Sequence, residues 1–195
     1  DGVVCWRNKP GIKLKELTED SSAGILRVPP GSFFQINRCG MDALIEKVVE
    51  TIKKTRPDNV IDLYCGAGLF SVAAAPFISG RLTGIDCDLD TIKTASQNAG
   101  KLAPGRCKFI AERADKVIRD ILNGRSKSGR TLLITDPPRA GLDAKTREAI
   151  AHAGPEGIIY ISCAPDTLCR DLDFLLKESY RMASSRMVDM FPRTS

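Results

Sequence analysis

Three aspartates and one cysteine each follow an apolar stretch of this 195-residue chain, and their types and places suit chemistry. These residues are Asp62, Asp86, Asp136 and Cys163. The apolar stretches before them predict strands of a parallel sheet, whose carboxyl ends share the edge at which open α/β sheets bind ligands. A carboxylate there can accept hydrogen bonds from hydroxyl groups or attract a cation, and a thiolate can act as a nucleophile. We therefore predict one site at that edge, built from acids and a thiol.

Residues 60–70 (VIDLYCGAGLF) predict a buried strand, a tight glycine turn and the start of a helix. Gly66 and Gly68 allow the backbone to turn sharply and to approach a ligand closely, because neither residue has a Cβ. Backbone N–H groups at such a turn face the ligand. Asp62, just before the turn, disfavours a phosphate and favours a cationic or hydroxyl-bearing ligand. A lone Gly-x-Gly also occurs in ordinary strand–helix connections, so the interpretation depends on the rest of the chain.

Two further acids follow predicted strands. Asp86 is placed to accept hydrogen bonds from ribose hydroxyls. It could instead cap the next helix, although Asp88 or Asp90 could fill that role. Asp136 is followed by Pro-Pro-Arg at 137–139, and two prolines make this turn stiff because they fix φ. An Asp and an Arg on a stiff turn are typical of a preorganised substrate platform, or of a simple rigid connection.

Cys163 follows a strand and lies close to the start of the next helix, a position that lowers a thiol pKa and favours the thiolate. We expect the other six of the seven cysteines to be buried and inert, including Cys65 in the glycine turn. No C-x-x-C pair occurs, which disfavours a metal cluster and a disulfide framework and favours a reducing cytoplasm. The single histidine, His152, lies in a helical pattern and disfavours a Ser-His-Asp triad.

Composition and length fit one α/β domain with a sizeable core, since 43% of the residues are hydrophobic. The net charge of +5 is compatible with an anionic partner such as RNA, but many ordinary proteins are as basic. No stretch has the length and hydrophobicity of a membrane span, and no signal peptide is evident, so we expect no membrane partner and a cytoplasmic location. The chain begins with Asp1, and we expect it to be a fragment of a longer protein.

Predicted strands and helices alternate along most of the chain. The strands are at 60–63, 82–86, 107–111, 131–136, 157–163 and 182–191, and the helices are at 41–54, 71–75, 91–102, 115–122, 144–153 and 167–177. This alternation predicts an α/β fold with a mostly parallel, doubly wound sheet, right-handed crossovers and helices on both faces.

The first 29 residues differ from the rest. They contain two short predicted strands, at 2–6 and 24–28, separated by a polar segment. We interpret residues 1–29 as the remnant of a preceding β-rich region, and residues 30–195 as the main domain.

Together, these segments resemble the RNA 5-methyluridine methyltransferases, which use S-adenosylmethionine. The matching segments occur in family order over nearly all of residues 29–195, and they are 32–37 (SFFQIN), 62–68 (DLYCGAG), 136–141 (DPPRAG), 162–168 (SCAPDTL) and 189–192 (DMFP). The resemblance implies a Rossmann-like class I S-adenosylmethionine-dependent methyltransferase fold. It also implies methyl transfer to carbon 5 of a uridine in tRNA or rRNA.

The resemblance also assigns roles to individual residues. Contacts with S-adenosylmethionine would come from Gln35, Tyr64, Asp86 and Asp136, with Asp115 near the adenine and Gly66 and Gly68 forming the turn. Cys163 would be the nucleophile, adding to carbon 6 of uracil so that carbon 5 can attack the methyl group. A base must then remove the carbon 5 proton. From this chemistry, rather than from the resemblance, we hypothesise that Arg139 stabilises the thiolate or a uracil oxygen and that the target base is flipped out of its stack.

Three features depart from the family pattern. Ala164 and Leu69 stand where the family usually or commonly has Asn. The family's base is a Glu just beyond the point where this sequence stops. We therefore expect a catalytic domain cut before its last strand, with weak cofactor binding and no turnover. The family's N-terminal RNA-binding barrel and the iron–sulfur cysteines of some members are also absent from this sequence, so no metal or cluster is expected.

Two other functions remain open. One is a different RNA methyltransferase, acting on carbon 5 of cytidine or on an amino group. Arg139 disfavours amino methylation, which usually has an aromatic residue after Asp-Pro-Pro, and Ser162 stands where cytidine enzymes have Pro before the cysteine. The other is a non-catalytic RNA-binding module, which the intact Cys163 and Asp136 disfavour.

Overall fold

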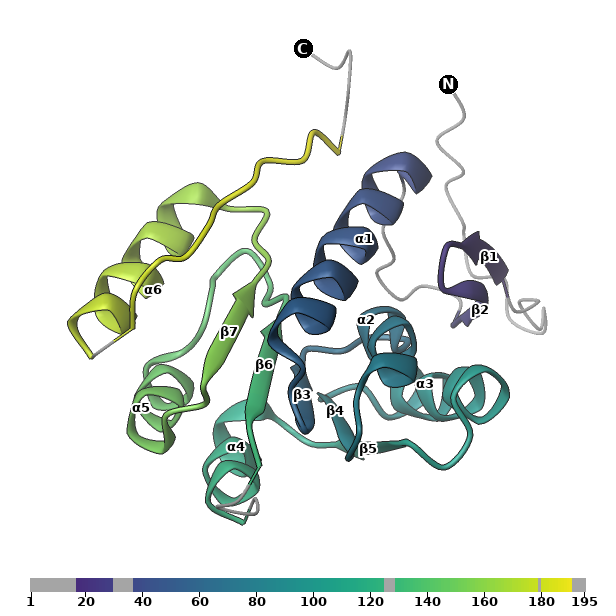
Figure 1. The fold of residues 1–195 in the computed structure, drawn as a ribbon, viewed down its shortest axis with the longest axis horizontal. Coiled ribbons are helices and arrows are strands. Elements are labelled where there is room, and N and C mark those ends of the chain that lie inside the picture. The colour runs from purple at the N-terminus through teal and green to yellow at the C-terminus, as the bar shows by residue number, and fades with distance from the viewer. Residues whose placement is uncertain (1–16, 30–36, 125–128, 179, 191–195) are drawn as a thin grey trace, which may run out of the picture.

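A computed structural model describes residues 17–29, 37–124, 129–178 and 180–190, and Figure 1 shows their arrangement. Within these ranges, the central sheet has five parallel strands, which are β3 (Asn59–Leu63), β4 (Leu82–Asp86), β5 (Cys107–Ala111), β6 (Thr131–Thr135) and β7 (Gly157–Tyr160). Their order across the sheet is β5-β4-β3-β6-β7. The chain thus builds outward from β3 in one direction and then in the other. The neighbours β3 and β6 form the switch point beside which open α/β sheets bind ligands.

Helices cover both faces of this sheet, as predicted (Figure 1). One face carries α1 (Arg38–Thr55), α2 (Leu69–Ala74), continued by the short 3-10 helix η1 (Ala75–Phe77), and α3 (Leu89–Leu102), while the other carries α4 (Ala114–Asn123), α5 (Ala144–Ala153) and α6 (Pro165–Lys177). Successive strand residues point to opposite faces. Val60 and Leu132 accordingly belong to the first core, and Ile61 and Leu133 belong to the second.

An antiparallel hairpin of β1 (Leu17–Ser21) and β2 (Gly24–Val28) precedes α1. The strand predicted at 24–28 is confirmed, but the interpretation of residues 17–21 as part of a polar connection was wrong. Leu26 of β2 is fully buried in the same core as α1, and Asn98 of α3 exchanges two 2.9 Å hydrogen bonds with the backbone of Arg27. The boundary at residue 29 stays a prediction. The strand predicted at 2–6 lies outside the described residues.

Residues 180–190 run in an extended conformation after α6. They pair with no strand in the described part of the chain, so the strand predicted there is not found over residues 182–190. Most of their side chains are exposed, including Met187, which is 95% exposed. The segment is held at its end instead, because the Asn37 amide donates a 3.0 Å hydrogen bond to the Met190 carbonyl. No helix of the described ranges has the length and hydrophobicity to cross a membrane.

Gly84 in β4 lies where no side chain fits. An added Cβ would be 2.5 Å from Phe109 Cδ1 and 3.1 Å from Cys65 Sγ. We predict that Gly84→Ala lowers the free energy of unfolding by about 1–3 kcal/mol, because overpacking forces neighbours to move. Gly100→Ala is the matched control, since Gly100 lies in α3 with no atom within 4 Å of the added Cβ. Alanine there should leave stability unchanged or raise it by up to about 1 kcal/mol. Urea denaturation measures both, and equal midpoints for the two variants would refute the packing argument.

Candidate active site

The carboxyl ends of the strands bring the predicted residues together at one edge of the sheet. The Asp136 N–H donates to the Leu63 carbonyl at 3.4 Å, and the Ile161 N–H donates to the Thr135 carbonyl at 2.9 Å. The segments that follow β3, β6 and β7 therefore lie side by side. Cys163, two residues beyond Ile161, is in the loop next to the turn that begins at Asp136.

The turn after β3 contains three residues with positive φ, which are Tyr64 (60°), Gly66 (52°) and Gly68 (87°). The prediction of a glycine turn is confirmed. Gly68 is needed for packing as well, because an added Cβ would be 3.2 Å from the Cβ of Ala95 in α3. At Gly66 an added Cβ would meet nothing within 4 Å, so that side of the turn is open. Tyr64 is unexpected, since a left-handed conformation strains a non-glycine residue, and such strain is typical of functional sites.

Asp86 connects β4 to this turn. Its Oδ2 accepts a 3.0 Å hydrogen bond from the Gly66 N–H, and its Oδ1 accepts one of 3.1 Å from the Asp88 N–H. The capping role that was the alternative for Asp86 belongs to Asp88, whose side chain accepts a 2.8 Å hydrogen bond from the Thr91 N–H. That hydrogen bond lowers the pKa of Asp88. Asp86, half-buried at the strand end, is not used as the helix cap.

Asp62 is fully buried directly beneath the turn. Its Oδ2 accepts a 2.6 Å hydrogen bond from the Ser71 hydroxyl, while its Oδ1 has no hydrogen-bond partner among the described residues. Burial raises the pKa of Asp62 to about 7. The Ser71 hydrogen bond opposes this rise, and the charges of Asp136 and Asp86 add to it. Three interacting carboxylates thus concentrate negative charge at this end of the sheet, an arrangement that favours a cation.

Two residues predicted to contact a ligand have surroundings that shift their pKa values. Tyr64 is half-buried, and burial, the main cause, raises the pKa of its phenol to about 12. Asp115 lies in the first turn of α4, where its Oδ1 accepts a 2.8 Å hydrogen bond from Arg113 Nε. This pair lowers the pKa of Asp115. Gln35, also predicted as a contact, lies outside the described residues.

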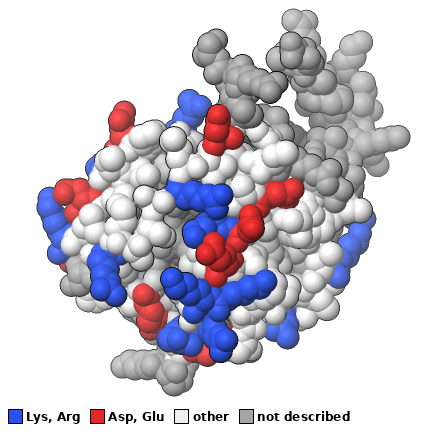
Figure 2. Space-filling model, turned by 45° about the horizontal axis from the view of Figure 1, so that its top comes forward, with Lys and Arg blue, Asp and Glu red and all other residues white. Residues whose placement is uncertain are grey.

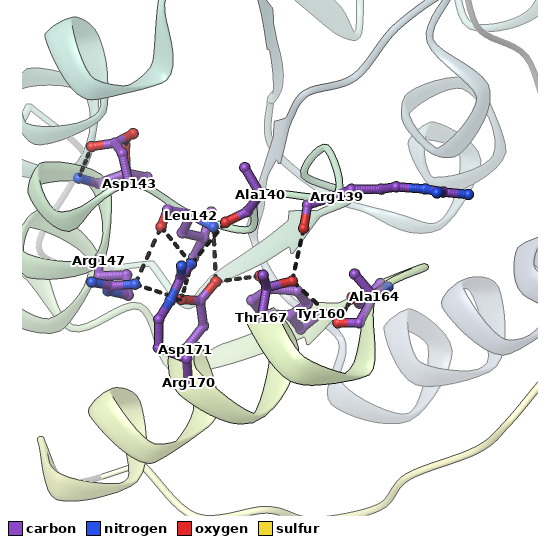
Figure 3. Close-up of polar contacts among 12 residues, drawn as sticks. Arg139, Ala140, Leu142, Asp143, Arg147, Tyr160, Ala164, Thr167, Arg170 and Asp171 are labelled. Carbon is purple, nitrogen blue, oxygen red and sulfur yellow. Dashed lines mark hydrogen bonds and ion pairs between the residues drawn. The ribbon is translucent and has the colours of Figure 1, made fainter.

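The stiff turn after Asp136 is tied to the Cys163 loop. The Gly141 N–H closes the turn by donating a 2.8 Å hydrogen bond to the Pro138 carbonyl. The Thr167 hydroxyl of α6 lies 3.0 Å from the Arg139 carbonyl of the turn and 3.1 Å from the Ala164 carbonyl of the loop. Figure 3 shows the exposed Arg139 side chain extending away from these contacts.

Cys163 is exposed, two residues before the first residue of α6. The expectation that the other cysteines are buried is correct for Cys65, whose thiol pKa is raised well above its ordinary value by burial. Cys107 is half-buried, and burial raises its pKa to about 11. The expectation was wrong for three cysteines with exposed positions on helices or in a loop, which are Cys39, Cys87 and Cys169. Cys5 lies outside the described residues.

One buried acid near the site, Asp171 of α6, was not predicted from the sequence, and it binds the turn after Asp136. Its position beside Arg170 in an amphipathic helix gave no signal, because charged residues in such helices usually face water. No group of three or more His, Cys, Asp or Glu side chains within the described ranges is placed to hold a metal ion.

Residues 15–195 match a family model described as tRNA (uracil-5-)-methyltransferase. The chain belongs to the tRNA (uracil-5-)-methyltransferase family. The family resemblance and the Rossmann-like fold predicted from the sequence are therefore confirmed.

Relatives and a solved structure agree with the tRNA (uracil-5-)-methyltransferase family. The chain is 32% identical to the tRNA (uracil(54)-C(5))-methyltransferase of Schizosaccharomyces pombe, in an alignment that covers all of this chain and 38% of that protein. It is also 35% identical to an uncharacterized RNA methyltransferase of Geobacter sulfurreducens, in an alignment that covers 91% of this chain and 35% of that protein. It also superposes, with a TM-score of 0.75 and 28% identity, on the Pyrococcus abyssi tRNA (uracil-54, C5)-methyltransferase in complex with S-adenosyl-L-homocysteine. That match covers 92% of this chain and 42% of the other. The chain thus spans about two-fifths of these proteins.

The buried Asp62 makes stability depend on pH. Its pKa of about 7 in the folded chain exceeds its ordinary value of 3.8. The folded chain therefore binds this proton more tightly than the unfolded chain, so the contribution of Asp62 to stability is largest below about pH 4 and declines as the pH rises to about 7. Asp62→Asn keeps the shape without the charge. We predict that the free energy of unfolding of the variant, relative to the parent, increases by about 2 kcal/mol from pH 5 to pH 8.

Urea denaturation at pH 5 and pH 8 measures this difference. Asp88→Asn is the control, because the lowered pKa of Asp88 leaves its carboxyl ionised in the folded and unfolded chains over this pH range. Its stability difference from the parent should therefore be the same at both pH values. An Asp62→Asn variant that shares the pH dependence of the parent would show that Asp62 does not titrate near neutrality.

Proposed function

We propose that this chain is the catalytic part of an S-adenosylmethionine-dependent methyltransferase that modifies carbon 5 of a uridine in tRNA or rRNA. One observation supports this most strongly. In a chain of the uracil-5-methyltransferase family, an open glycine turn, three carboxylates and an exposed cysteine lie along one edge of the sheet. The S. pombe and P. abyssi relatives, named as enzymes that act on uracil 54 of tRNA, make tRNA the first substrate to test.

The residues at the edge fit S-adenosylmethionine. This molecule carries a sulfonium and an ammonium group, and the charges of Asp62, Asp86 and Asp136 complement both. The open side of the turn at Gly66 leaves room for a ligand against the backbone. The unpartnered Oδ1 of Asp62 provides a buried acceptor below that turn. S-adenosylmethionine would supply a methyl group activated by the positive sulfur.

Each residue has a defined part in this proposal. Asp86 would accept hydrogen bonds from the ribose hydroxyls while its carboxylate also fixes Gly66. Asp136 would face the positive end of the cofactor from the first residue of the stiff turn. Asp115 would lie near the adenine at the start of α4. Tyr64 would contribute its backbone, which turns at a φ of 60°, and its half-buried ring.

The nucleophile in this proposal is Cys163. Its thiolate adds to carbon 6 of uracil, and the electrons of the ring double bond move to carbon 5 and the adjacent carbonyl, forming an enolate. Carbon 5 would then bond to the methyl group as the methyl–sulfur bond breaks, and the sulfur would keep the electron pair of that bond. A base removes the proton of carbon 5, and the electron pair left behind re-forms the double bond as the thiolate leaves carbon 6. Arg139, exposed at the end of its stiff turn, would stabilise the thiolate or the enolate oxygen.

The RNA proposal rests on the site and the family rather than on a basic surface. Figure 2 shows Lys and Arg side chains interspersed with Asp and Glu side chains on the face drawn there. No purely basic surface therefore marks the path of the RNA on the described part of this face. A uridine within a helix or a stacked loop would have to be flipped out to bring its carbon 6 to Cys163. A free thiol nucleophile suits a reducing compartment, so we infer a cytoplasmic location.

Trapping the covalent adduct tests the reaction directly. The protein is incubated with S-adenosylmethionine and a transcript that contains 5-fluorouridine, and the product is analysed by mass spectrometry. Fluorine cannot leave as a proton, so the reaction should stop after methyl transfer with the RNA bound to Cys163. We predict an adduct that carries one methyl group on this residue. Cys163→Ala should abolish it, whereas Cys169→Ser should retain it, because Cys169 is also exposed but lies one turn inside α6.

The other outcomes separate the alternatives. Methylated RNA without an adduct would assign the chain to another class of RNA methyltransferase, acting on an amino group. An adduct with 5-fluorocytidine but not with 5-fluorouridine would point to a 5-methylcytidine enzyme. Binding of tRNA and rRNA fragments without methylation or adduct would favour a non-catalytic RNA-binding module.

The charge of Asp136 should distinguish the methyl donor from its product. S-adenosylmethionine has a positive sulfur, and S-adenosylhomocysteine has a neutral one. We predict that Asp136→Asn weakens binding of S-adenosylmethionine roughly 10-fold, the effect of one charge pair in a partly screened site, and weakens binding of S-adenosylhomocysteine less. Isothermal titration calorimetry measures both affinities. Equal losses for the two ligands would mean that Asp136 does not face the sulfur.

A further inference from the structure

A buried carboxylate outside the proposed ligand contacts connects the two loops of the site. Asp171 of α6 is fully buried, and Figure 3 shows hydrogen bonds converging on it. Five donors reach its two oxygens, and they are Arg147 Nη1 (2.6 Å), Arg170 Nε (2.9 Å) and Arg170 Nη2 (2.8 Å) on Oδ1, and the Leu142 N–H (2.8 Å) and Tyr160 hydroxyl (2.6 Å) on Oδ2. These donors come from the turn after β6, from β7, from α5 and from α6 itself.

The surroundings of Asp171 favour its ionised form. Burial alone would raise its pKa, but the hydrogen bonds from Tyr160, Leu142, Arg147 and Arg170 outweigh burial, and the pKa is lowered. Asp171 is therefore a carboxylate near neutral pH, and each of its oxygens accepts hydrogen bonds. Such a buried charge with several donors fixes the positions of the groups around it, because moving any one of them leaves a polar group without a partner.

The same two arginines also hold the turn that begins at Asp136. Arg170 Nη2 donates to the carbonyls of Ala140 (2.9 Å) and Leu142 (3.2 Å), and Arg147 Nη1 donates to that of Leu142 (3.3 Å). Gly141 lies between them with a φ of 73°. An added Cβ there would be 2.6 Å from both Arg170 Nη2 and Asp171 Oδ2. The end of the turn thus lies directly against Asp171 and Arg170, at a distance that only glycine allows.

Helix α6 connects this cluster to the cysteine loop. Thr167 lies four residues before Asp171, on the same side of the helix. Its hydroxyl contacts the carbonyls of Arg139 in the turn and Ala164 in the loop. Cys163 immediately precedes Ala164, so one helix end positions the thiol, the Arg139 backbone and the end of the turn together.

We propose that Asp171 is a positioning residue for methyl transfer. Through α6, it fixes the turn that begins at Asp136 relative to the loop that contains Cys163. This inference rests on the proposed function of the site. Asp171 touches neither substrate nor cofactor in this arrangement. It acts through Leu142 and the two arginines on the turn, and through α6 on the loop.

Asp171→Asn tests the proposal, because all five contacts are donated to the carboxylate. The amide has one oxygen and an NH2 group that cannot accept. If its oxygen accepts from the arginines, its NH2 group faces the Leu142 N–H, and the hydrogen bond from Leu142 that holds the turn is lost. We expect the rate of adduct formation with 5-fluorouridine RNA, at saturating S-adenosylmethionine, to fall roughly 10- to 100-fold, since small misplacements of reacting groups have effects of this size. The affinity for S-adenosylhomocysteine should change much less, because Asp86 and Gly66 are not held by Asp171.

Tyr160→Phe is the matched control. It removes one hydrogen bond from the same Oδ2 atom, but it leaves the carboxylate able to accept from the Leu142 N–H and from both arginines. Its adduct rate should stay within about twofold of the parent, even where its urea midpoint falls, because only a stabilising hydrogen bond is lost. Thr167→Val removes the hydroxyl that contacts both the turn and the loop. It should lower the rate of adduct formation as Asp171→Asn does, and it replaces that variant in the test if Asp171→Asn does not fold.

The outcomes distinguish this inference from the proposed function. A parent protein that forms no adduct would overturn both. A parent that reacts, together with an Asp171→Asn variant that reacts equally fast, would overturn only the positioning role. Equal losses of rate in Asp171→Asn and Tyr160→Phe, matched by equal losses of stability, would also overturn it, because they would reflect general destabilisation.

Discussion

The pairing of β3 with β4 on one side and β6 on the other is the interaction on which the rest of the site depends. It places the turn after β3 between Asp86 and Asp136, and the backbone hydrogen bonds at Leu63 and Cys65 extend that pairing past the strand ends. Because β3 and β6 are neighbours at the switch point, the chain segments that follow them diverge toward opposite faces of the sheet. Asp86, Asp136 and Cys163 lie at or just after the ends of strands along this edge.

The acids at this edge make the fold less stable than it could be. Asp62 is buried with an unpartnered oxygen near two other carboxylates, and Tyr64 has a left-handed backbone conformation. Neither feature helps the chain to fold, since burying an unpaired charge and straining a backbone both cost free energy. The cost at Asp62 would be offset when a cationic ligand occupies the edge, because its charge would be attracted by the carboxylates there. Local features that oppose folding are therefore concentrated where a sulfonium cofactor would bind, as expected for a functional site.

Much of this fold could be predicted because most elements have short apolar runs bounded by polar or glycine residues. The bounds of β4, β5 and α5 match the prediction fully. The polar strand β1 was missed because its pairing with β2, rather than its own composition, determines its structure. Residues 182–190 have strand-like composition but no partner among the described residues, and a strand requires one. Asp171 was missed because burial of a charged residue depends on donors from three other elements, and no local pattern records that.

The two halves of the site are held by different interactions on opposite faces of the sheet. The cofactor half is fixed by Asp86, which binds the glycine turn, and by Asp62, which binds Ser71, a buried residue of α2. The thiol half is fixed by α6 and its buried carboxylate on the other face, with α5. The two halves are joined by the backbone hydrogen bond from the Asp136 N–H to the Leu63 carbonyl, and each half is held by side chains of its own. The residues proposed to bind the methyl donor and the proposed nucleophile are thus held by separate side-chain contacts. The turn at Asp136 is the point where they meet, since its first residue faces the acids and its last residues contact Asp171.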